Sequence, residues 1–335
     1  MSTVRATNFQ HASAAAPAIV LAADGSATAN VSSINNGPLA GMRNAIINGN
    51  FDHWQRGTSD FGQGYRADRW NAYLVAGVSM LQSRYTLTDA QRNIIGYEAA
   101  YAWQVFTSDT TSSVQLQQPI EGVKTFASQQ ISVSFWAFTD TGTCTISSLM
   151  AQGFGSGGSP STSVETSLTL SATTITTTPT KITAVVTLPS ITGKTLGTDP
   201  NSDSLSLVIR KVAGAANRLR IARVQVEPGP VDTPFERRPI GTELALCQRY
   251  YCETRATARY YASINGQANE NQVYWPVGMR AFPSIIVSTG GSRQNIATIA
   301  VQASTKSGCR FVITAISAGV DTFAINEIVT ASAEL

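Results

Sequence analysis

Residues 44–238 contain many short runs typical of β-strands, in some of which apolar and polar residues alternate with a two-residue period. In residues 131–138 the large apolar side chains first alternate with serines and then occupy both faces. This change predicts a central strand that is covered on both sides. Residues 183–188 and 205–209 are further short runs rich in β-branched and aliphatic residues. Such runs, separated by Gly, Ser and Asp turns, favour a β-sandwich, most simply a jelly roll.

One predicted strand changes its apolar parity part of the way along. Leu219 and Ile221 set one parity, and Val224 and Val226 set the other. Because side chains alternate strictly between the two faces of a strand, a one-residue switch requires one extra residue in the run. The sequence therefore predicts a β-bulge near Ala222.

A proline-rich connector follows this strand, with Gly229 and the residues Pro228, Pro230, Pro234 and Pro239. Prolines at this density exclude the interior of a regular helix or strand, so the segment is expected to be extended. A short helix is expected from Gly241 or Thr242, because apolar residues recur there every three or four positions. The strand candidates beyond it are 272–277, 284–288, 296–302, 310–316 and 322–329.

The chain is therefore expected to be all-β and to have three parts. Residues 1–43 are small and polar with few large apolar groups, and are expected to form an extended anchor that becomes ordered on a partner. A disordered leader is the alternative for this segment. Residues 44–238 are expected to form a jelly-roll β-sandwich. Residues 239–335 are expected to form a short helix and a second small, β-sandwich-like tip domain.

Composition narrows the possible partners. Charged residues make up 13% of the 335 residues, about half the usual share, and the formal net charge is +3. Basic and acidic residues are interspersed, so the sequence offers no basic face for a phosphate backbone, and nucleic-acid binding is not expected. The longest apolar run near the start, residues 14–23, is interrupted by Pro17 and is too short to span a bilayer, so no membrane insertion is expected.

The four cysteines form no Cys-x-x-Cys pair, which favours four unpaired, buried thiols. Cys247 and Cys252 are both placed on the predicted helix, about 140° apart around its axis. Free cysteines fit synthesis in a reducing cytoplasm.

Six distinct motifs follow one another along the chain. They are Asn48–Gly57 (NGNFDHWQRG), Tyr65–Trp70 (YRADRW), Ser134–Phe138 (SFWAF), Phe154–Ser161 (FGSGGSPS), Val224–Glu236 (VQVEPGPVDTPFE) and Glu236–Tyr251 (ERRPIGTELALCQRYY). Together they resemble bacteriophage tail-fibre proteins in which a carbohydrate-binding-like (galactose-binding-like) jelly roll precedes a small β-rich tip. The resemblance covers about residues 44–260. It implies a structural component of the virion, assembled as a homotrimer, made in the host cytoplasm and attached to the tail or baseplate through residues 1–43.

The sequence lacks the usual signatures of catalysis, so no enzyme activity, catalytic residue, metal or cofactor is predicted. The only histidines, His11 and His53, cannot form a triad or a zinc site with any nearby cluster. Carboxylates that could cleave a polysaccharide are scattered, and Asp68 is expected to pair with its neighbours Arg66 and Arg69. Oxygens for a structural Ca²⁺ could come from Asn50, Asp52 and Glu227, but their spacing predicts no site.

Sugar binding is the function that remains possible. Aromatic rings stack on pyranose rings, and nearby polar groups bind the sugar hydroxyls. Four aromatics of the tip domain lie beside a polar stretch and are the candidate ligand-binding residues: Tyr260, Tyr261, Tyr274 and Trp275. Core packing is the alternative role for each. The expected function is attachment to a host-surface glycan. The alternatives are a baseplate or head-decoration protein without a ligand and, less favoured, a polysaccharide depolymerase.

Overall fold

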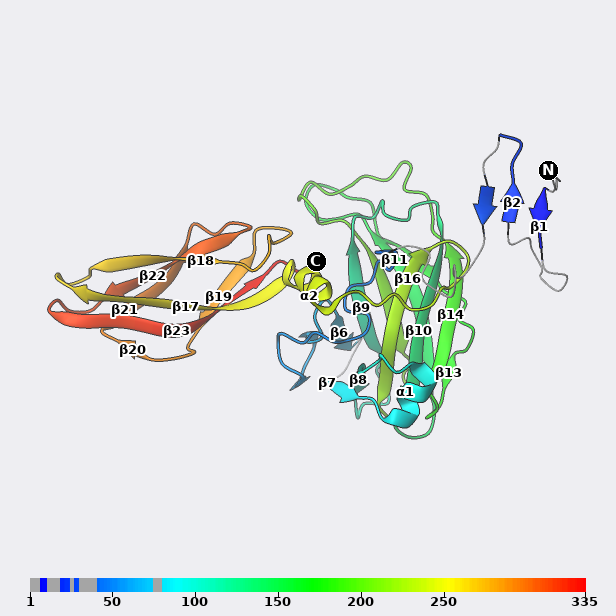
Figure 1. The fold of residues 1–335 in the computed structure, drawn as a ribbon, viewed down its shortest axis with the longest axis horizontal. Helices are drawn as coiled ribbons and strands as arrows, with labels where there is room; N and C mark the ends of the chain where they lie inside the picture. Colours follow the sequence, from blue (N-terminus) through cyan, green and yellow to red (C-terminus); the bar gives the residue numbers. More distant parts are fainter. Residues whose placement is uncertain (1–6, 11–18, 25–26, 30–40, 75–79) are drawn as a thin grey trace, which may run out of the picture.

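The structure is a computed structural model that describes residues 7–10, 19–24, 27–29, 41–74 and 80–335. Two β-sandwiches account for most of it, and a short helix lies between them (Figure 1). Within the described ranges, no helix is long and apolar enough to cross a membrane. The all-β prediction, with a jelly roll followed by a helix and a second small sandwich, is confirmed.

The first sandwich consists of two antiparallel sheets. The six-stranded sheet has the order β14 (Thr180–Thr187), β10 (Gln130–Thr139), β16 (Leu219–Pro228), β8 (Tyr101–Phe106), β7 (Leu81–Thr86), β4 (Ser59–Phe61). The seven-stranded sheet has the order β12 (Val164–Ser167), β11 (Cys144–Gly153), β15 (Ser204–Lys211), β9 (Val114–Glu121), β6 (Asn71–Leu74), β5 (Gly64–Tyr65), and β13 (Thr174–Ile175) pairs with β11.

Three aromatic rings fill the core between these sheets. Phe51 lies 5.3 Å from Trp70 and 5.8 Å from Trp103, measured between ring centroids, and all three side chains are buried. The tilted contacts are those that aromatic quadrupoles favour. Two of the motifs seen in the sequence, those around Phe51 and Trp70, therefore have core roles.

The bulge predicted in β16 is confirmed. Trp136 lies opposite Ala222 and Ser134 lies opposite Gln225, so β16 uses one residue more than β10 across this step. Arg223 within the bulge has a φ of 50°. The extra residue explains why the apolar parity changes in mid-strand.

The outer face of the six-stranded sheet is covered over its central strands. Helix α1 (Asp89–Ile95), which the sequence analysis missed, packs there and buries Phe138 and Ala222 on β10 and β16. The connector after β16 covers the other end, where the Ser132 hydroxyl donates to the carbonyl of Val231. The prediction that β10 is covered on both sides is therefore confirmed.

The second sandwich, called the tip domain here, follows helix α2 (Ile240–Gln248), which begins one or two residues earlier than predicted. One sheet contains β17 (Tyr251–Ala262), β23 (Val320–Ser332), β19 (Ser284–Ser288) and β20 (Arg293–Gln294). The other contains β18 (Ala268–Tyr274), β22 (Gly308–Ala315) and β21 (Ile296–Gln302). Strand β17 was not predicted, and the helical placement of Cys252 was wrong, because Cys252 lies in β17. All four cysteines are free and buried.

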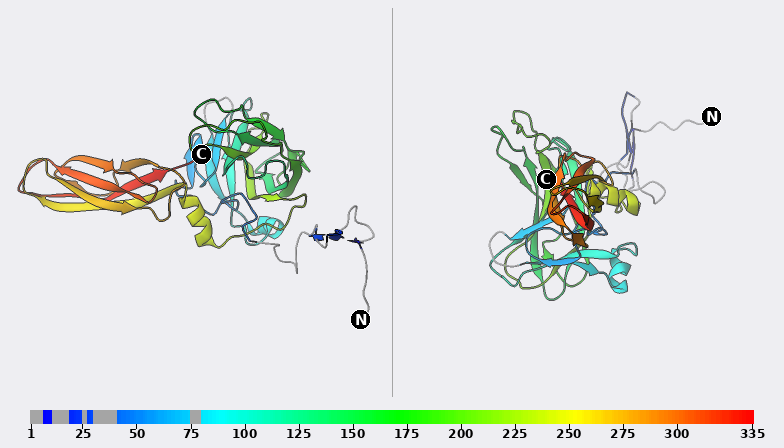
Figure 2. Two further views of the ribbon diagram at one scale, coloured as in Figure 1. Left: turned by 90° about the horizontal axis from the view of Figure 1, so that it is seen from above. Right: turned by 90° about the vertical axis from the view of Figure 1, so that its left-hand side faces the viewer.

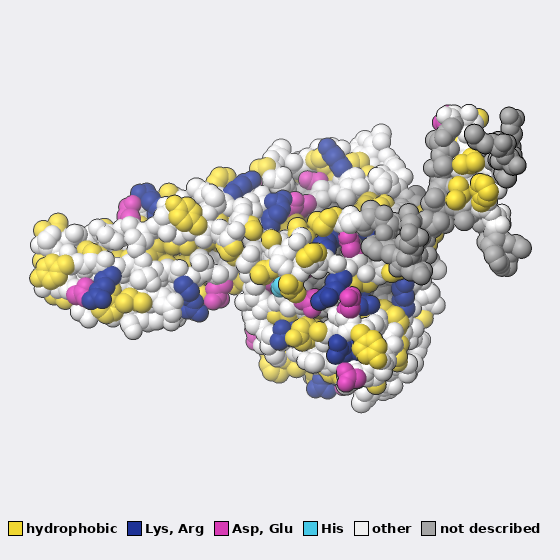
Figure 3. Space-filling view, in the orientation of Figure 1, with side chains coloured by type: hydrophobic (Ala, Val, Ile, Leu, Met, Phe, Trp, Pro, Cys, Tyr) yellow, Lys and Arg dark blue, Asp and Glu magenta, His cyan; other side chains and the backbone are white. Residues whose placement is uncertain are grey.

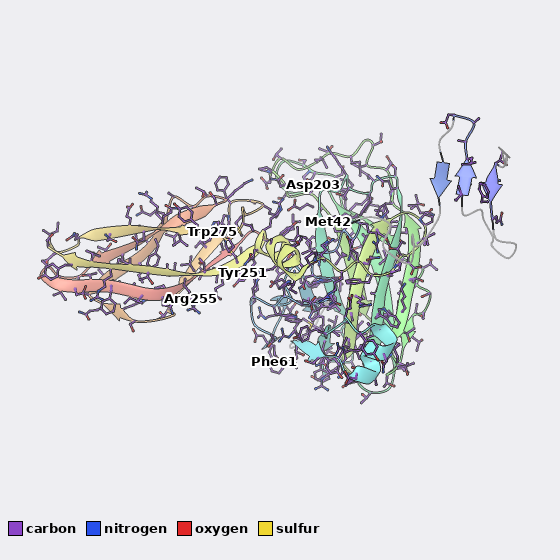
Figure 4. The ribbon with its side chains drawn as sticks, viewed as in Figure 1. Met42, Phe61, Asp203, Tyr251, Arg255 and Trp275 are labelled. Carbon is purple, nitrogen blue, oxygen red and sulfur yellow. The ribbon has the colours of Figure 1, made fainter. Side chains whose placement is uncertain are left out.

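The two sandwiches meet in a joint built from arginines, tyrosines and carboxylates, in which Glu334 pairs with two arginines. The guanidinium of Arg69 forms an ion pair with Glu334 and lies 3.4 Å from the ring centroid of Tyr250. Arg56 lies 3.1 Å from the same carboxylate and 3.6 Å from the ring centroid of Tyr251, which Figure 4 labels at the junction. Charged and stacked contacts of this kind fix orientation as well as distance.

Within residues 1–43, three short strands form an antiparallel sheet: β1 (Asn8–Phe9), β2 (Ile19–Leu21) and β3 (Ala27–Ala29). Phe9, Val20 and Leu21 are exposed, so β1 and β2 bury no core of their own. Residues 1–6, 11–18, 25–26 and 30–40 of the predicted anchor lie outside the described residues. The anchoring role stays a prediction.

Candidate functional site

Two of the four predicted ligand-binding aromatics are held inside the tip domain. Trp275 is 6% exposed, belongs to the tip core and donates its indole N–H to the carbonyl of Thr305. Tyr260 is half-buried, packs against the same core, and its hydroxyl donates to the carbonyl of Gln267. Trp275 therefore packs in the core, and the ring of Tyr260 is only partly accessible to a ligand.

The other two aromatics are exposed but lie far apart. Tyr274 is 71% exposed at the end of β18, opposite Gly308, whereas Tyr261 is exposed near the far end of β17, opposite Asp321. They belong to different sheets of the tip domain. The structure therefore does not bring the four candidates together into one site. Figure 2 shows how narrow the tip domain is beside the first sandwich.

The tip domain also has an open hollow of about 480 Å³ at the edges of β19 and β21. Val287, Ile296 and Ile299 form its apolar side, and Arg293 lies at its rim. The Arg293 guanidinium donates two hydrogen bonds to Glu327, at 2.6 and 2.8 Å. None of the four predicted aromatics lines this hollow.

The expected pairing of Asp68 with Arg66 and Arg69 is wrong. The Asp68 carboxylate accepts hydrogen bonds from the backbone and the side chain of Gln55, at 3.0 and 2.8 Å. Arg66 pairs with Asp60 instead, and Arg69 pairs with Glu334. Burial raises the pKa of Asp68, against the lowering effect of the Gln55 hydrogen bonds. The side-chain amide of Gln55 also donates to the carbonyl of Tyr251 at 2.9 Å, so Asp68 lies beside the joint between the sandwiches.

Of the oxygens considered for Ca²⁺, those of Glu227 and Asp52 accept hydrogen bonds from protein groups, whereas Oδ1 of Asn50 is buried without a partner. Glu227 accepts from Arg43, Gln225 and Thr233, and the amide of Asn50 donates to Asp52. Among the described residues, no three His, Cys, Asp or Glu side chains form a group that could hold a metal ion.

The outer face of the seven-stranded sheet carries a patch of polar side chains, which we call the open face. In one row across it, Ser147 of β11 lies opposite Arg210 of β15, which lies opposite Gln115 of β9, which lies opposite Tyr73 of β6. The next row includes Leu149, Val208, Gln117 and Asn71. Neighbouring strands are about 4.8 Å apart, so the first row places its four side chains next to one another. In the second row Leu149 and Val208 are buried, which leaves Gln117 and Asn71 partly exposed.

Hydrogen bonds hold the open face in one arrangement. The Tyr73 hydroxyl lies 2.7 Å from Oε1 of Gln115 and 3.2 Å from Oε1 of Gln117. The side-chain amide of Gln117 donates to the hydroxyl of Ser206 at 3.0 Å. Because the two glutamine carbonyls face the tyrosine, their amide groups have fixed directions. A preorganised set of polar groups loses little entropy when it binds a ligand.

One ion pair lies at the side of this network. Nη2 of Arg210 is 3.9 Å from Oε1 of Glu165, an exposed residue of the edge strand β12. Burial raises the pKa of Tyr73, the positive charge of Arg210 opposes that rise, and the negative charge of Glu165 adds to it. Tyr73, Arg210 and Glu165 therefore lie close enough to influence one another electrostatically.

The tip domain also contacts the seven-stranded sheet, at the ends of the strands that lie away from Arg210 and Tyr73. Arg249 of the tip domain pairs with Glu121 at 2.7 Å, and Arg280 donates to the carbonyl of Asn201 at 2.8 Å. Glu121 lies six residues beyond Gln115 on β9, a distance of about 20 Å along a strand. The row through Arg210 and Tyr73 is thus well separated from the joint.

The sequence analysis did not propose any residue of the open face. Its members come from four separate strands, and only the strand register brings them together. One signal was present: the run Gln115-Leu116-Gln117 alternates amides with a core leucine, where an unspecialised outer face often carries Thr, Lys or Glu.

Comparisons with known proteins concern the fold. No protein-family model and no curated protein matches this sequence. Among solved structures, the enzymatically active domain of bacteriophage CBA120 tailspike protein 4 is similar at 12% identity, over 59% of this chain and 24% of that chain, with a TM-score of 0.34. A protein described as CBM4 matches at 16% identity over 55% of this chain and 99% of its own, with a TM-score of 0.32. A family 11 carbohydrate-binding module from Clostridium thermocellum matches at 9% identity over 53% and 98%, with a TM-score of 0.30. Likeness at this level says nothing of function.

Proposed function

We propose that this chain is an adhesive component of a phage tail fibre that binds host-surface glycans through the open face. The observation that supports this most is the difference between the two outer faces of the first sandwich. Helix α1 and the connector cover the outer face of the six-stranded sheet. On the outer face of the seven-stranded sheet, Ser147 is exposed and Tyr73, Gln117 and Arg210 are partly exposed.

The chemistry of the open face suits a saccharide. A sugar offers several hydroxyls, each able to donate and accept, and apolar C–H faces that pack against an aromatic ring. The open face has amides in Gln115 and Gln117, a hydroxyl in Ser147 and the ring of Tyr73 within two adjacent rows, and the hydroxyl of Ser206 in the row beyond them. Such a site can bind the polar groups of a sugar chain that lies across the outer face of the seven-stranded sheet.

The proposed action is adhesion without turnover. Glycoside hydrolysis needs two carboxyl groups on either side of the scissile bond, with separations of about 5–10 Å. On the described part of the open face, Glu165 is the carboxylate beside Arg210. A purely structural protein without a ligand remains the alternative, and it predicts no glycan binding at all.

We further propose that the chain acts as a homotrimer, attached to the tail or baseplate through residues 1–43. Weak binding at each copy would then be strengthened by effective concentration. Light scattering of the purified chain should give three times the mass of one chain at micromolar concentration. A stable monomer would contradict the trimer, and would leave glycan binding to be tested separately.

Glycan binding is tested by Tyr73→Ala. If the Tyr73 ring packs against a sugar and its hydroxyl orients both glutamines, the variant should bind about 10-fold or more weakly, as for other aromatic contacts worth about 1–3 kcal/mol. Binding is measured on a glycan array and by adsorption to host cells, and folding by the melting temperature. Tyr97→Ala is the matched control, because Tyr97 is an exposed tyrosine in the turn after α1, away from the open face.

Two outcomes would contradict this proposal. If the unaltered chain binds no glycan and no host surface, adhesion is wrong. If Tyr73→Ala binds as well as the unaltered chain while the melting temperature stays the same, the site lies elsewhere. In that case the exposed Tyr274 of the tip domain becomes the next residue to test.

A further inference from the structure

The open face contains more hydrogen-bond donors than the protein satisfies. Gln115 is 8% exposed, and its carbonyl oxygen is held by the Tyr73 hydroxyl. Its side-chain amide nitrogen donates to no described residue. The side chain is nine-tenths buried, but this nitrogen still reaches solvent, so it can donate to a ligand.

Arg210 also has hydrogen-bond donors without an acceptor in the described part of the protein. Its Nε is buried without an acceptor, and its nearest carboxylate, that of Glu165, lies at 3.9 Å, beyond hydrogen-bonding distance. No hydrogen bond joins any nitrogen of its guanidinium to a described residue. An arginine has five N–H donors in a planar fork, so this group can receive a bidentate acceptor.

These two donor groups are neighbours. Arg210 lies directly opposite Gln115 in the pairing of β15 with β9, and opposite Ser147 in the pairing of β15 with β11. The Tyr73 hydroxyl occupies the Gln115 carbonyl on the far side, which leaves the amide for a ligand. The row therefore presents a guanidinium, an amide N–H₂ and a serine hydroxyl side by side.

We infer that the glycan bound at the open face carries a carboxylate, which Arg210 and Gln115 receive together; this rests on the proposed function. A carboxylate has two oxygens that match the fork of a guanidinium, and it accepts without donating. A neutral sugar hydroxyl carries no charge to pair with the guanidinium and brings a donor of its own. Uronic and sialic acids are the sugar classes that carry such a group.

Glu165 provides a second test of this inference, in which a substitution should strengthen binding. It is an exposed side chain on an edge strand, 3.9 Å from the guanidinium, and its negative charge opposes an anionic ligand. An arriving carboxylate therefore competes with Glu165 for Arg210. Removing the Glu165 charge should strengthen the binding of acidic glycans and leave the binding of neutral ones unchanged.

The experiment compares the full chain with Arg210→Gln and Glu165→Gln on an array of uronic-acid, sialic-acid and neutral glycans. The acidic glycans that bind are then tested against their carboxyl-reduced forms by calorimetry. The unaltered chain should prefer the acidic form by 10-fold or more, and this preference should weaken as salt is raised. Arg210→Gln should abolish the preference, and Glu165→Gln should increase it several-fold. Arg218→Gln is the control, because Arg218 is a part-exposed arginine paired with Asp140 away from the open face.

The possible failures are distinguishable. If the chain binds only neutral glycans, or binds the acidic and reduced forms equally, the carboxylate inference is wrong and glycan binding stands. If Arg210→Gln keeps the full acidic preference, another cation receives the carboxylate and the inference is again wrong. If no glycan binds to the unaltered chain, the proposed function fails and the inference fails with it.

Discussion

Replacing Glu334 with alanine should destabilise the joint between the two sandwiches by about 3–5 kcal/mol, because it leaves a buried arginine without its counter-charge. Arg69 is 1% exposed, donates to the carbonyl of Pro119 and stacks on Tyr250, so its guanidinium cannot turn out to water. The same carboxylate also serves Arg56 at 3.1 Å. Urea unfolding monitored by tyrosine and tryptophan fluorescence should show the loss.

A matched control and a double variant separate charge burial from simple truncation. Glu253→Ala removes an exposed carboxylate that lies 3.6 Å from Arg255, and should cost less than about 1 kcal/mol. Combining Glu334→Ala with Arg69→Met should recover part of the lost stability relative to Glu334→Ala alone, because the more deeply buried of the two uncompensated charges is then gone, while Arg56 keeps its charge. An unfolding free energy for Glu334→Ala within about 1 kcal/mol of the original chain would show that the pair does not hold the joint.

Local patterns predicted the parts of the fold that depend on one strand at a time. The parity switch between Ile221 and Val224 located the bulge, since alternation is a property of a single chain segment. Helix α1 was missed because its seven residues are too few for a helical period to show. Its capping box, Thr88 with Gln91, was the available signal. Strand β17 was missed because its inward residues include alanines, which give little apolar contrast.

The candidate site depends on pairing between distant strands, and single-sequence patterns do not give that pairing. Tyr73, Gln115 and Arg210 are neighbours only because β6, β9 and β15 adopt one register, which a shift of one residue would undo. The same limit applies to Asp68. Its sequence neighbours Arg66 and Arg69 suggested a pairing, but both arginines bind carboxylates that come from elsewhere. Adjacency in sequence is a weak guide on a strand or turn, where successive side chains point different ways.

Two adjacent aromatics of the tip domain should respond to substitution in opposite ways. Trp275→Ala should lower the free energy of unfolding by about 3–5 kcal/mol, because it empties a large volume in a small core and leaves the Thr305 carbonyl without its indole donor. Tyr274→Ala should change it by less than about 0.5 kcal/mol, because that ring is 71% exposed. Thermal and urea unfolding of both variants measure the contrast.

Adsorption to host cells then separates the two roles that the sequence left open for these residues. Loss of adsorption in folded Tyr274→Ala would add the tip domain to the binding surface, because no change in stability could account for it. Trp275→Ala should lose adsorption only under conditions where its tip domain unfolds, since the buried ring has no face to offer a ligand. A Trp275→Phe variant tests this directly: it refills most of the core volume, so it should recover most of the stability and adsorb normally. If Trp275→Phe is stable but fails to adsorb, the indole contacts the host surface and its assignment to the core is wrong.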